Sequence, residues 1–368
     1  MKNERTCSGR PIKILLSGPG LIGRKHAELI ACSERSTLAA IVAPPTDCNL
    51  SFASKQDVPL FTSVEDALGR VLIDAAIIAS PNKFHAEQTL LCIGRGVPVL
   101  VEKPLAADLR SAASICREAK IRNVPVLVGH HRTYSPLLSA AKDFIRSERF
   151  GDLVAVQGSA LFRKPEHYFE EGPWRASFGG GPILINLIHD IGTLRFLCGP
   201  ISAVSATASH ARRRFEVEDT VAMAIRFEQG ALGTFLLSDI AASNQSWEMT
   251  SAENPAYPHS ADAACYHLVG TNGSLDFPTL QGRFYGFDDL PSWWNPFQTM
   301  RLTVEKADPL KEQLRHFEAV VDGRAKPLVS PDEGLENMRV LEAIRRAIAT
   351  RQTVELSTVH PDDSPVCV

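Results

Sequence analysis

Residues 12–23, IKILLSGPGLIG, decide the fold of the first part of the chain. The apolar run that ends at Ser17 predicts a buried strand, and a helical pattern begins a few residues later. The turn between them has the spacing G-x-G-x-x-G, which indicates a phosphate-binding turn when a strand precedes it and a helix follows. Backbone N–H groups and the positive end of the helix then face a diphosphate. The expected dinucleotide-binding residues of this turn are Gly18, Gly20, Leu21, Ile22 and Gly23.

The alternation of apolar runs and helical patterns continues to about residue 128. Further apolar runs lie at 38–43, 74–80, 97–103 and 124–128, and helical patterns at 85–96 and 108–120. This order predicts a doubly wound parallel sheet with helices on both faces, the Rossmann type of α/β fold. We therefore expect a dinucleotide-binding domain at residues 1–128.

The second part of the chain has a different pattern. After residue 150 the apolar runs are longer, alternate with polar residues and are joined by short turns, such as EQG at 228–230 and TNG at 271–273. These features predict hairpins in an open, mostly antiparallel sheet. A late helix is expected to start at SPDE (330–333), where Ser330 and Glu333 can form a capping box. Residues 129–368 are thus expected to form an α+β domain.

Composition narrows the class of protein. The 368 residues suffice for two domains, and 44% hydrophobic and 22% charged residues are ordinary values for a globular chain. A net charge of −3 gives no basic surface for nucleic acid, and no apolar stretch is long enough for a membrane span. The eight cysteines form no CxxC pair, so we expect reduced packing residues, a cytoplasmic location and no metal site.

The end of the second apolar run bears on the choice of coenzyme. It reads Ala43-Pro44-Pro45, and Asp47 lies beyond it. A carboxylate at the strand end would bind the ribose 2′-OH of NAD, and an arginine would suit NADP. Neither is present, so the choice between NAD and NADP stays open.

Two further strand ends have polar residues where ligands bind on such sheets. The run at 97–103 ends on Glu102 and Lys103, followed by Pro104. The run before it leads into SPNKFH at 80–85. A single lysine after a strand is usually only solvated, but two polar strand ends beside a phosphate-binding turn favour a site. The expected residues there are Ser80, Pro81, Asn82, His85, Glu102 and Lys103.

The stretch GGGPILINLIHDIG at 179–192 predicts a core helix with one polar stripe. Pro182 fits its first turn, and Gly199-Pro200 ends it. At helical spacing the polar residues Asn186, His189, Asp190 and Thr193 share one side. The letters HDIG also occur in metal-dependent phosphohydrolases, but those all-helical proteins need further His and Asp ligands that this chain lacks, and we reject that interpretation.

The ordered motifs together resemble the Gfo/Idh/MocA family of NAD(P)-dependent oxidoreductases. Besides the helix around His189, they are GPGLIGRKH (18–26), ASPNKFHAEQTL (79–90), VEKP (101–104), VGHHRTYSP (128–136), WRASFGGGP (174–182), VEDT (217–220), VGTNGSL (269–275) and HF…GRAKPLVSPDEGL (316–335). The resemblance covers nearly the whole chain.

The resemblance implies roles for several of these residues. Lys103 corresponds to the catalytic lysine and His189 to the catalytic acid/base. Pro104 is expected to follow a cis peptide bond, and Asn82 and His85 to lie near the nicotinamide ribose. The substrate-binding residues implied are Lys103, Arg132, Trp174, Arg175, Asn186 and His189. The second domain would bind the substrate and, through its sheet, form a homodimer or homotetramer.

Two positions depart from the family pattern. Inositol-dehydrogenase-like members have an aspartate four residues before the histidine, where this chain has Ile185, and commonly another three residues after it, where it has Gly192. Asn186 could take over part of the lost polar role. An inositol-type substrate is therefore not assumed.

The sequence leads to one function and leaves alternatives open. We expect hydride transfer between nicotinamide and a carbinol or carbonyl carbon of a small polyhydroxylated substrate, a sugar, cyclitol or sugar acid. A non-catalytic dinucleotide-binding regulator, an NAD-dependent glycoside-cleaving enzyme and a reductase of non-sugar carbonyls remain alternatives. Trp247, Glu248, Glu253 and Asn254 flank a long irregular loop and could either line the substrate cleft or brace a subunit contact.

Overall fold

The structure is a computed structural model that describes residues 9–286 and 290–363. By its contacts the chain divides into two units. The first contains the residues up to His131 together with Leu310–Met338, and the second contains Arg132–Pro309 together with the residues from Arg339 onward. Each unit has its own sheet and its own core.

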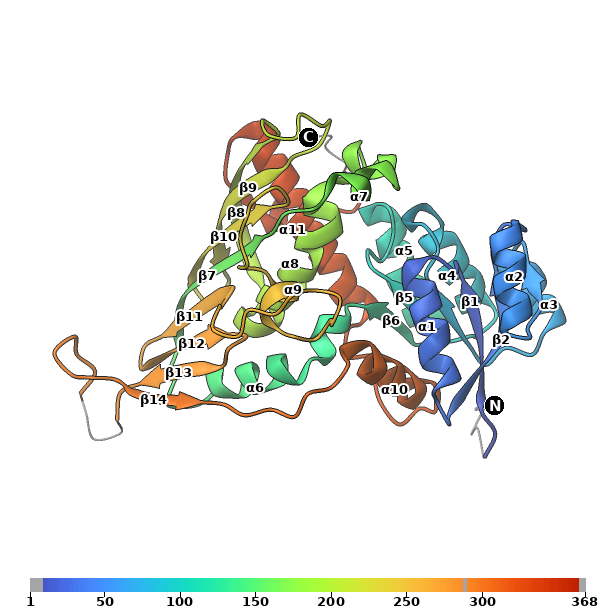
Figure 1. Cartoon of the computed structure of the whole chain (residues 1–368), viewed down its shortest axis with the longest axis horizontal. Coiled ribbons are helices and arrows are strands. Elements are labelled where there is room, and N and C mark those ends of the chain that lie inside the picture. Colours follow the sequence, from blue (N-terminus) through green and yellow to red (C-terminus); the bar gives the residue numbers. More distant parts are fainter. Residues whose placement is uncertain (1–8, 287–289, 364–368) are drawn as a thin grey trace. The chain divides into compact units, whose positions relative to one another are not determined.

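The first unit is built on a six-stranded parallel sheet (Figure 1). Its strands are β1 (Ile12–Ser17), β2 (Ser36–Val42), β3 (Leu60–Phe61), β4 (Ala75–Ile78), β5 (Val99–Glu102) and β6 (Val126–Gly129), in the order β3-β2-β1-β4-β5-β6. The connecting helices are α1 (Leu21–Ala31), α2 (Asp47–Lys55), α3 (Val64–Arg70), α4 (His85–Gly94) and α5 (Leu109–Arg122). All residues of β4, β5 and β6 are buried, as expected of central strands covered on both faces. The predicted doubly wound sheet is confirmed.

A segment late in the sequence, Leu310–Met338, also belongs to the first unit. It contains most of α10 (Pro309–Val321) and the start of α11 (Pro331–Thr350). The buried Glu318 of α10 accepts hydrogen bonds from Ser33 and Ser36, each at 2.6 Å. The sequence placed this segment with the second domain, whereas these contacts assign residues 310–338 to the first unit.

The second unit has a nine-stranded mixed sheet. Its strands are β7 (Leu153–Leu161), β8 (Ile201–Ser209), β9 (Thr220–Phe227), β10 (Leu232–Ser238), β11 (Tyr266–Gly270), β12 (Gly273–Phe277), β13 (Gln281–Phe284), β14 (Gln298–Arg301) and β15 (Val354–Glu355). The order is β14-β13-β12-β11-β7-β10-β9-β8-β15, and only the β7–β10 pair is parallel in the part of the chain described. The helical elements are α6 (Pro136–Ile145), α7 (Glu166–Glu170), α8 (Ile188–Cys198), α9 (Trp247–Thr250) and the end of α11, with short turns η3 (Pro173–Ala176), η4 (Ile183–Leu187) and η5 (Leu356–Thr358).

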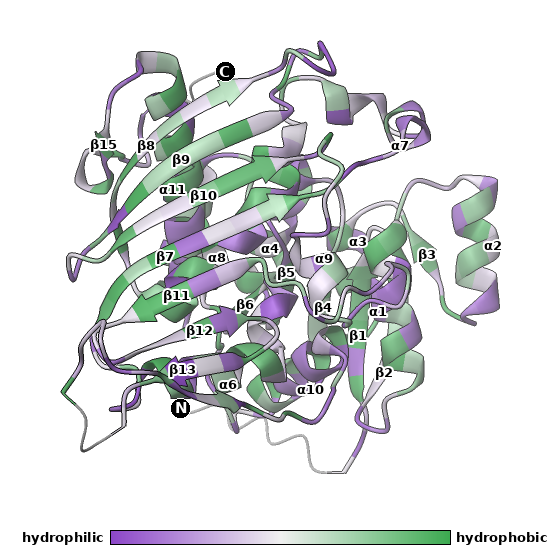
Figure 2. Cartoon of the chain, turned by 60° about the vertical axis from the view of Figure 1, so that its left-hand side comes forward, coloured by the Kyte–Doolittle hydropathy of each residue, from purple (hydrophilic) through white to green (hydrophobic). Residues whose placement is uncertain are grey.

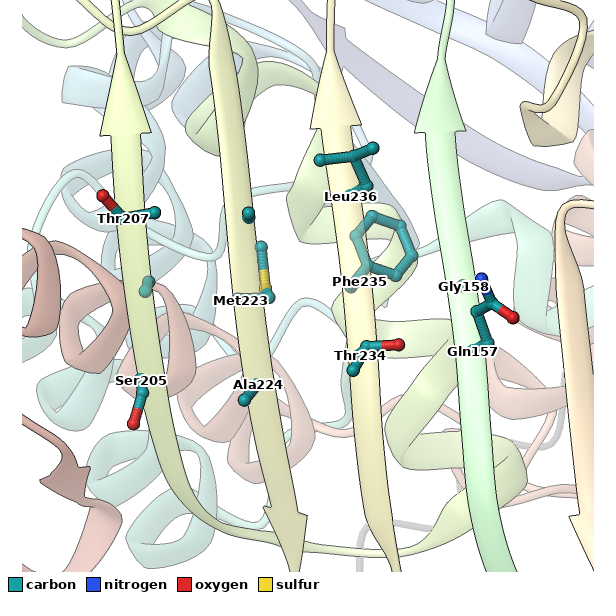
Figure 3. Close-up of a pocket in the computed structure, with 11 residues that line it drawn as sticks. Gln157, Gly158, Ser205, Thr207, Met223, Ala224, Thr234, Phe235 and Leu236 are labelled. Carbon is teal, nitrogen blue, oxygen red and sulfur yellow. The ribbon is translucent and has the colours of Figure 1, made fainter.

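One face of this sheet is packed and the other is open. Buried and exposed residues alternate along β9 and β10, and α6, α8 and the end of α11 lie on the buried side (Figures 1 and 2). The predicted hairpins β9–β10 and β11–β12 are confirmed. The open face has a shallow depression of about 520 Å³ over β7, β8, β9 and β10 (Figure 3). Leu232 and Leu236 of β10 are exposed on this face, at 60% and 41%.

The helix that contains His189 begins with a π-helical segment. Residues Ile183–Leu187 form η4, and the α-helix α8 follows directly. The first N–H of this segment, that of Ile183, is bound by the carboxylate of Glu218 at 2.7 Å, so the motif VEDT holds the start of the helix. Such π-segments inside helices occur frequently at functional sites.

The described cysteines carry no disulfide. Cys92, Cys116, Cys198 and Cys265 are buried, and Cys32 and Cys48 are exposed. Cys7 and Cys367 were expected to be packing residues as well, and they lie outside the described residues. Within the described ranges, no helix has the length and apolar character that a membrane crossing requires.

Candidate active site

The glycine turn of the first unit packs tightly on its protein side and is open on the other. Gly18 has a φ of +85°, and a Cβ there would lie 2.5 Å from the backbone of Ser80. A Cβ at Gly23 would lie 2.0 Å from the carbonyl oxygen of Gly18. At Gly20, by contrast, an added Cβ meets no atom within 4 Å, and the next side chain, Leu21, is 94% exposed. The turn therefore brings backbone N–H groups to an open surface, which fits a diphosphate.

The open position at Gly20 gives a test that separates binding from folding. Gly20 has an ordinary φ of −75°, so Gly20→Ala should leave the free energy of unfolding within about 0.5 kcal/mol of the native value. The new methyl group would occupy the space of the diphosphate, and we expect the Kd for NADH and NADPH, measured by fluorescence titration, to rise at least about tenfold. Gly69→Ala in α3, which also meets no atom within 4 Å, should leave both Kd values unchanged. Unaltered dinucleotide affinity in Gly20→Ala would refute this placement of the diphosphate.

The strand ends of β1 and β4 are joined by buried polar contacts. The hydroxyl groups of Ser17 and Ser80 both donate to Oε1 of Gln88, each at 2.8 Å. His85 is 1% exposed, and its Nε2 and Nδ1 lie 2.7 Å from the carbonyl oxygens of Ser80 and Pro104. His85 thus links two strand ends, while Asn82 remains partly exposed at the start of a short 3₁₀ turn.

Lys103 follows a residue at the end of β5 that makes a buried hydrogen bond. Glu102, 6% exposed, binds Nε2 of His26 on α1 at 2.8 Å. Burial favours the neutral acid, but the hydrogen bond and charge of His26, with the charges of His131 and Lys103, hold the pKa of Glu102 below its ordinary value. The helix of the glycine turn and the strand end that presents Lys103 are therefore fastened together. Lys103 itself is partly exposed, and its peptide bond to Pro104 is cis, as the resemblance implied.

In the second unit a cavity lies beside the helix that contains His189. Its volume is about 410 Å³, within the range of small-molecule sites. The polar residues that line it are Arg163, Lys164, Tyr168, Asn186, Ser243, Ser246, Glu248 and Tyr257. Asn186 and His189 are both partly exposed, and the two are three residues apart, about one helical turn.

A buried ionic network contacts this helix through Asp190. Arg132, 4% exposed, donates to Asp190 at 2.9 Å and to Glu248, and its guanidinium lies over the ring of Trp247. Tyr266 of β11 donates to the same Asp190 oxygen at 2.5 Å. Burial raises the pKa of Asp190 to about 6, although Arg132 opposes this shift. Arg132 is thus occupied by carboxylates of the chain itself.

The predicted polar stripe of the helix is divided. Asp190 and Thr193 are buried at 1% and 2%, and the hydroxyl of Thr193 donates to the carbonyl of His189 at 3.1 Å. Asp190 is buried because it is the acceptor for Arg132 and Tyr266. Only Asn186 and His189 remain partly exposed.

The residues predicted on the substrate side from the WRASF motif lie on a separate turn. Trp174 is 55% exposed, and the guanidinium of Arg175 lies 3.9 Å from the centre of the Tyr168 ring and donates to the Tyr168 carbonyl. Arg175 therefore positions Tyr168, which lines the cavity.

The long loop after α9 is attached to the second unit by Glu253. Its carboxylate accepts hydrogen bonds from Ser135 and, at 3.1 Å, from Nε1 of Trp247. Glu248 lines the cavity, whereas Asn254 is exposed and bonds only within the loop among the contacts described. Burial raises the pKa of Glu253 to about 7, with Ser135 and Arg132 opposing it.

The raised pKa of Glu253 predicts a pH-dependent stability. Since the folded pKa of about 7 lies above the unfolded value of 4.5, the contribution is full below pH 4.5 and is lost as the pH rises through 7. Glu253→Gln keeps an acceptor for Ser135 but does not titrate. We expect the variant to gain up to about 3 kcal/mol in the free energy of unfolding, relative to the native chain, between pH 4.5 and pH 8. Parallel urea denaturation curves over this range test the difference; a constant difference would exclude a titrating Glu253.

Two residues of the site were missed in the sequence. His26 could have been noticed as a polar residue on the inner side of α1, and Lys164 as a charged residue at the end of a long alternating strand. His26 ends the quoted motif GPGLIGRKH without a role of its own there, Lys164 belongs to none of the quoted motifs, and only the structure gives the two residues partners.

Comparisons with known proteins match both units. Residues 12–130 match the family described as "Oxidoreductase family, NAD-binding Rossmann fold", and residues 138–276 match the "GFO/IDH/MocA C-terminal domain". A 1,5-anhydro-D-fructose reductase of Ensifer adhaerens is 28% identical over 301 residues, which cover 81% of this chain and 84% of the reductase. A scyllo-inositol 2-dehydrogenase (NADP(+)) of Bacillus subtilis strain 168 is 23% identical over 363 residues, 94% of this chain and 96% of the relative. Among solved structures, the WlbA dehydrogenase of Bordetella pertussis in complex with NADH and UDP-GlcNAcA has a TM-score of 0.76 at 22% identity, with 94% of this chain and 99% of that chain covered.

Proposed function

The chain belongs to the Gfo/Idh/MocA family of oxidoreductases, and from that premise we propose that it transfers a hydride between NAD(P) and a carbinol or carbonyl carbon of a small polyhydroxylated substrate. The substrate class comprises sugars, cyclitols and sugar acids. The observation that carries the proposal is the placement of His189, partly exposed and one turn from a residue that lines a cavity of small-molecule size.

The first unit would hold the coenzyme. Gly18, Gly20 and Gly23, with Leu21 and Ile22, are proposed to bind the diphosphate, and the 80–82 turn the nicotinamide side. When bound, the nicotinamide ring supplies the hydride acceptor or donor. His85 acts as a positioning residue, since its buried ring lies between the backbone carbonyls of Ser80 and Pro104. NAD and NADP are both candidate coenzymes of the proposed reaction.

Two residues are proposed to act on the reacting hydroxyl group of the substrate. His189 takes the proton of the substrate hydroxyl in oxidation and returns it in reduction, a role typically worth about 10²–10⁴-fold in rate. Lys103 donates a hydrogen bond to the substrate oxygen on which negative charge develops. Arg132 acts on the site through Asp190 and Glu248, and Trp174, Arg175 and Asn186 are proposed to bind the substrate.

The open face of the second sheet is proposed to join copies of the chain into a homodimer or homotetramer. Its exposed Leu232 and Leu236 and the depression in Figure 3 support this assignment. A cytoplasmic location is proposed from the unpaired cysteines among the described residues. Neither nucleic acid nor a membrane is proposed as a partner.

A substrate panel tests the proposed function. Sugars, cyclitols and sugar acids are assayed with NAD and with NADP by the absorbance of the reduced nicotinamide. We expect turnover with at least one member of the panel and one of the coenzymes. Tight dinucleotide binding without any turnover would favour a non-catalytic regulator.

A further inference from the structure

We propose that Lys164 and Asn186 form an anion-binding subsite in the cavity of the second unit, and that the substrate is a polyhydroxy acid whose carboxylate binds there. The proposal rests on the proposed function, because it takes the reacting hydroxyl group to be at His189.

The position of Lys164 is fixed by its surroundings. Its backbone N–H donates to the carbonyl of Asp239 at 2.9 Å, and the residue is 9% exposed while it lines the cavity. Its Nζ lies 2.7 Å from Oδ1 of Asn186 and 3.5 Å from a carboxylate oxygen of Asp239. An ammonium group has three donors, and these two are its acceptors among the described residues. Neither acceptor takes the third N–H, and the centre of the Tyr168 ring, which also lines the cavity, lies 5.0 Å from Nζ.

The charges around the cavity favour an anion. Asp239 is shared between Lys164 and the buried Arg213, whose Nε lies 2.8 Å from it. Glu248, the one carboxylate among the lining residues described, is paired with Arg132. The exposed Arg163 adds a further cation to the lining. A carboxylate that enters the cavity thus meets cationic side chains and no uncompensated carboxylate of the lining.

The protonation of Lys164 fits the same role. Burial lowers its pKa to about 8; Asp239 favours the charged form, whereas Arg213 and Arg175 oppose it. Lys164 is therefore charged below about pH 8, and a bound carboxylate would restore its charge above that value. A hydroxyl group of an uncharged sugar offers no such compensation.

The spacing along the helix indicates where the carboxylate lies on the substrate. Asn186 lies in the π-helical segment Ile183–Leu187 and His189 near the start of α8, so the two residues are about one turn apart along one continuous helix. Asn186 holds Nζ of Lys164, and His189 follows at this spacing. A substrate with its hydroxyl at His189 therefore places its carboxylate within a few bonds of the oxidised carbon. In the oxidation the C–H hydrogen of the carbinol would pass as a hydride to NAD(P)⁺ and the O–H hydrogen as a proton to His189, so that a C=O bond forms and a keto acid is left.

Matched pairs of substrates and variants test the subsite. Aldoses and the uronic acids of the same stereochemistry are compared as substrates for the native chain, Lys164→Met and Lys164→Arg. Lys55→Met, at the exposed end of α2, is the control. We expect the native chain to prefer the acid by about 100-fold or more in kcat/KM, as for a buried charge pair. Lys164→Met should lose this preference through a raised KM for the acid, with Lys164→Arg retaining part of it and the Kd for NADH unchanged in both.

The outcomes distinguish the two proposals. Equal or better use of the uncharged sugars by the native chain, or an equal loss for both classes in Lys164→Met, overturns the anion subsite and leaves hydride transfer intact. Calorimetric titration of the NADH complex with the acids measures binding when no compound is turned over. If an acid binds to the native chain but not to Lys164→Met, and no compound is turned over, the subsite stands and the proposed redox function fails.

Discussion

His189→Asn is expected to lower kcat by about 10²–10⁴-fold while the Kd values for NADH and NADPH stay at the native value. Asparagine keeps a polar side chain of similar size but cannot accept the hydroxyl proton. Because His189 is only partly buried at the side of α8, the substitution should leave the fold unchanged. Steady-state kinetics with the substrate found in the panel, together with a fluorescence titration of the coenzyme, measure the two quantities.

The control for this variant is His267→Asn. His267 is on β11, its side chain is 43% exposed and it pairs with Asp276. This variant should keep the native kcat. Full activity of His189→Asn, or an equal loss in both variants, would remove His189 from the reaction.

Arg132→Met is expected to destabilise the second unit by about 3–5 kcal/mol. The variant leaves Asp190, 1% exposed, and Glu248 close together without their shared cation. Burial raises the pKa of Asp190 above its ordinary value even with Arg132 present. The charged carboxylate is therefore already unfavourable to the stability of the native fold. Urea denaturation at neutral pH measures the loss of stability.

A matched surface pair shows whether burial is the cause. Arg226 pairs with Glu355 at 2.5 Å, and both side chains are about half exposed. Arg226→Met should cost no more than about 1 kcal/mol. Similar losses for the two variants would mean that the Arg132 network contributes only as a surface ion pair does.

The fold followed from periodicity where the elements are long. A buried run such as Ile12–Ser17 has the pattern of a parallel strand covered on both faces. An alternating run such as Thr220–Phe227 has the pattern of an antiparallel strand with one open face. The short strands β3 and β15 have two residues each and no readable period. The assignment of residues 310–338 depends on contacts such as Glu318 with Ser33, which are 285 positions apart in the chain and leave no local pattern.

The candidate site could be predicted only in part, for the same reason. The glycine turn and Lys103 belong to short motifs with a stated chemistry. Arg132, Asp190 and Tyr266 form a network across 58 and 76 positions, so the sequence could not show that Arg132 binds carboxylates of the chain itself. The burial of Asp190 and Thr193 could not be predicted, because periodicity gives the side of a helix on which a residue lies but not the partner that this side contacts.

The transfer of deuterium from substrate to coenzyme distinguishes hydride transfer from other reactions of this chain. A substrate from the panel, deuterated at its carbinol carbon, is incubated with the oxidised coenzyme, and the reduced coenzyme is examined by mass spectrometry. If hydride transfer occurs, the deuterium is found in the reduced nicotinamide, and an unlabelled substrate in D₂O gives unlabelled reduced coenzyme. Hydrogen taken from the solvent, or product formed without reduction of the coenzyme, would contradict hydride transfer as the function of this chain.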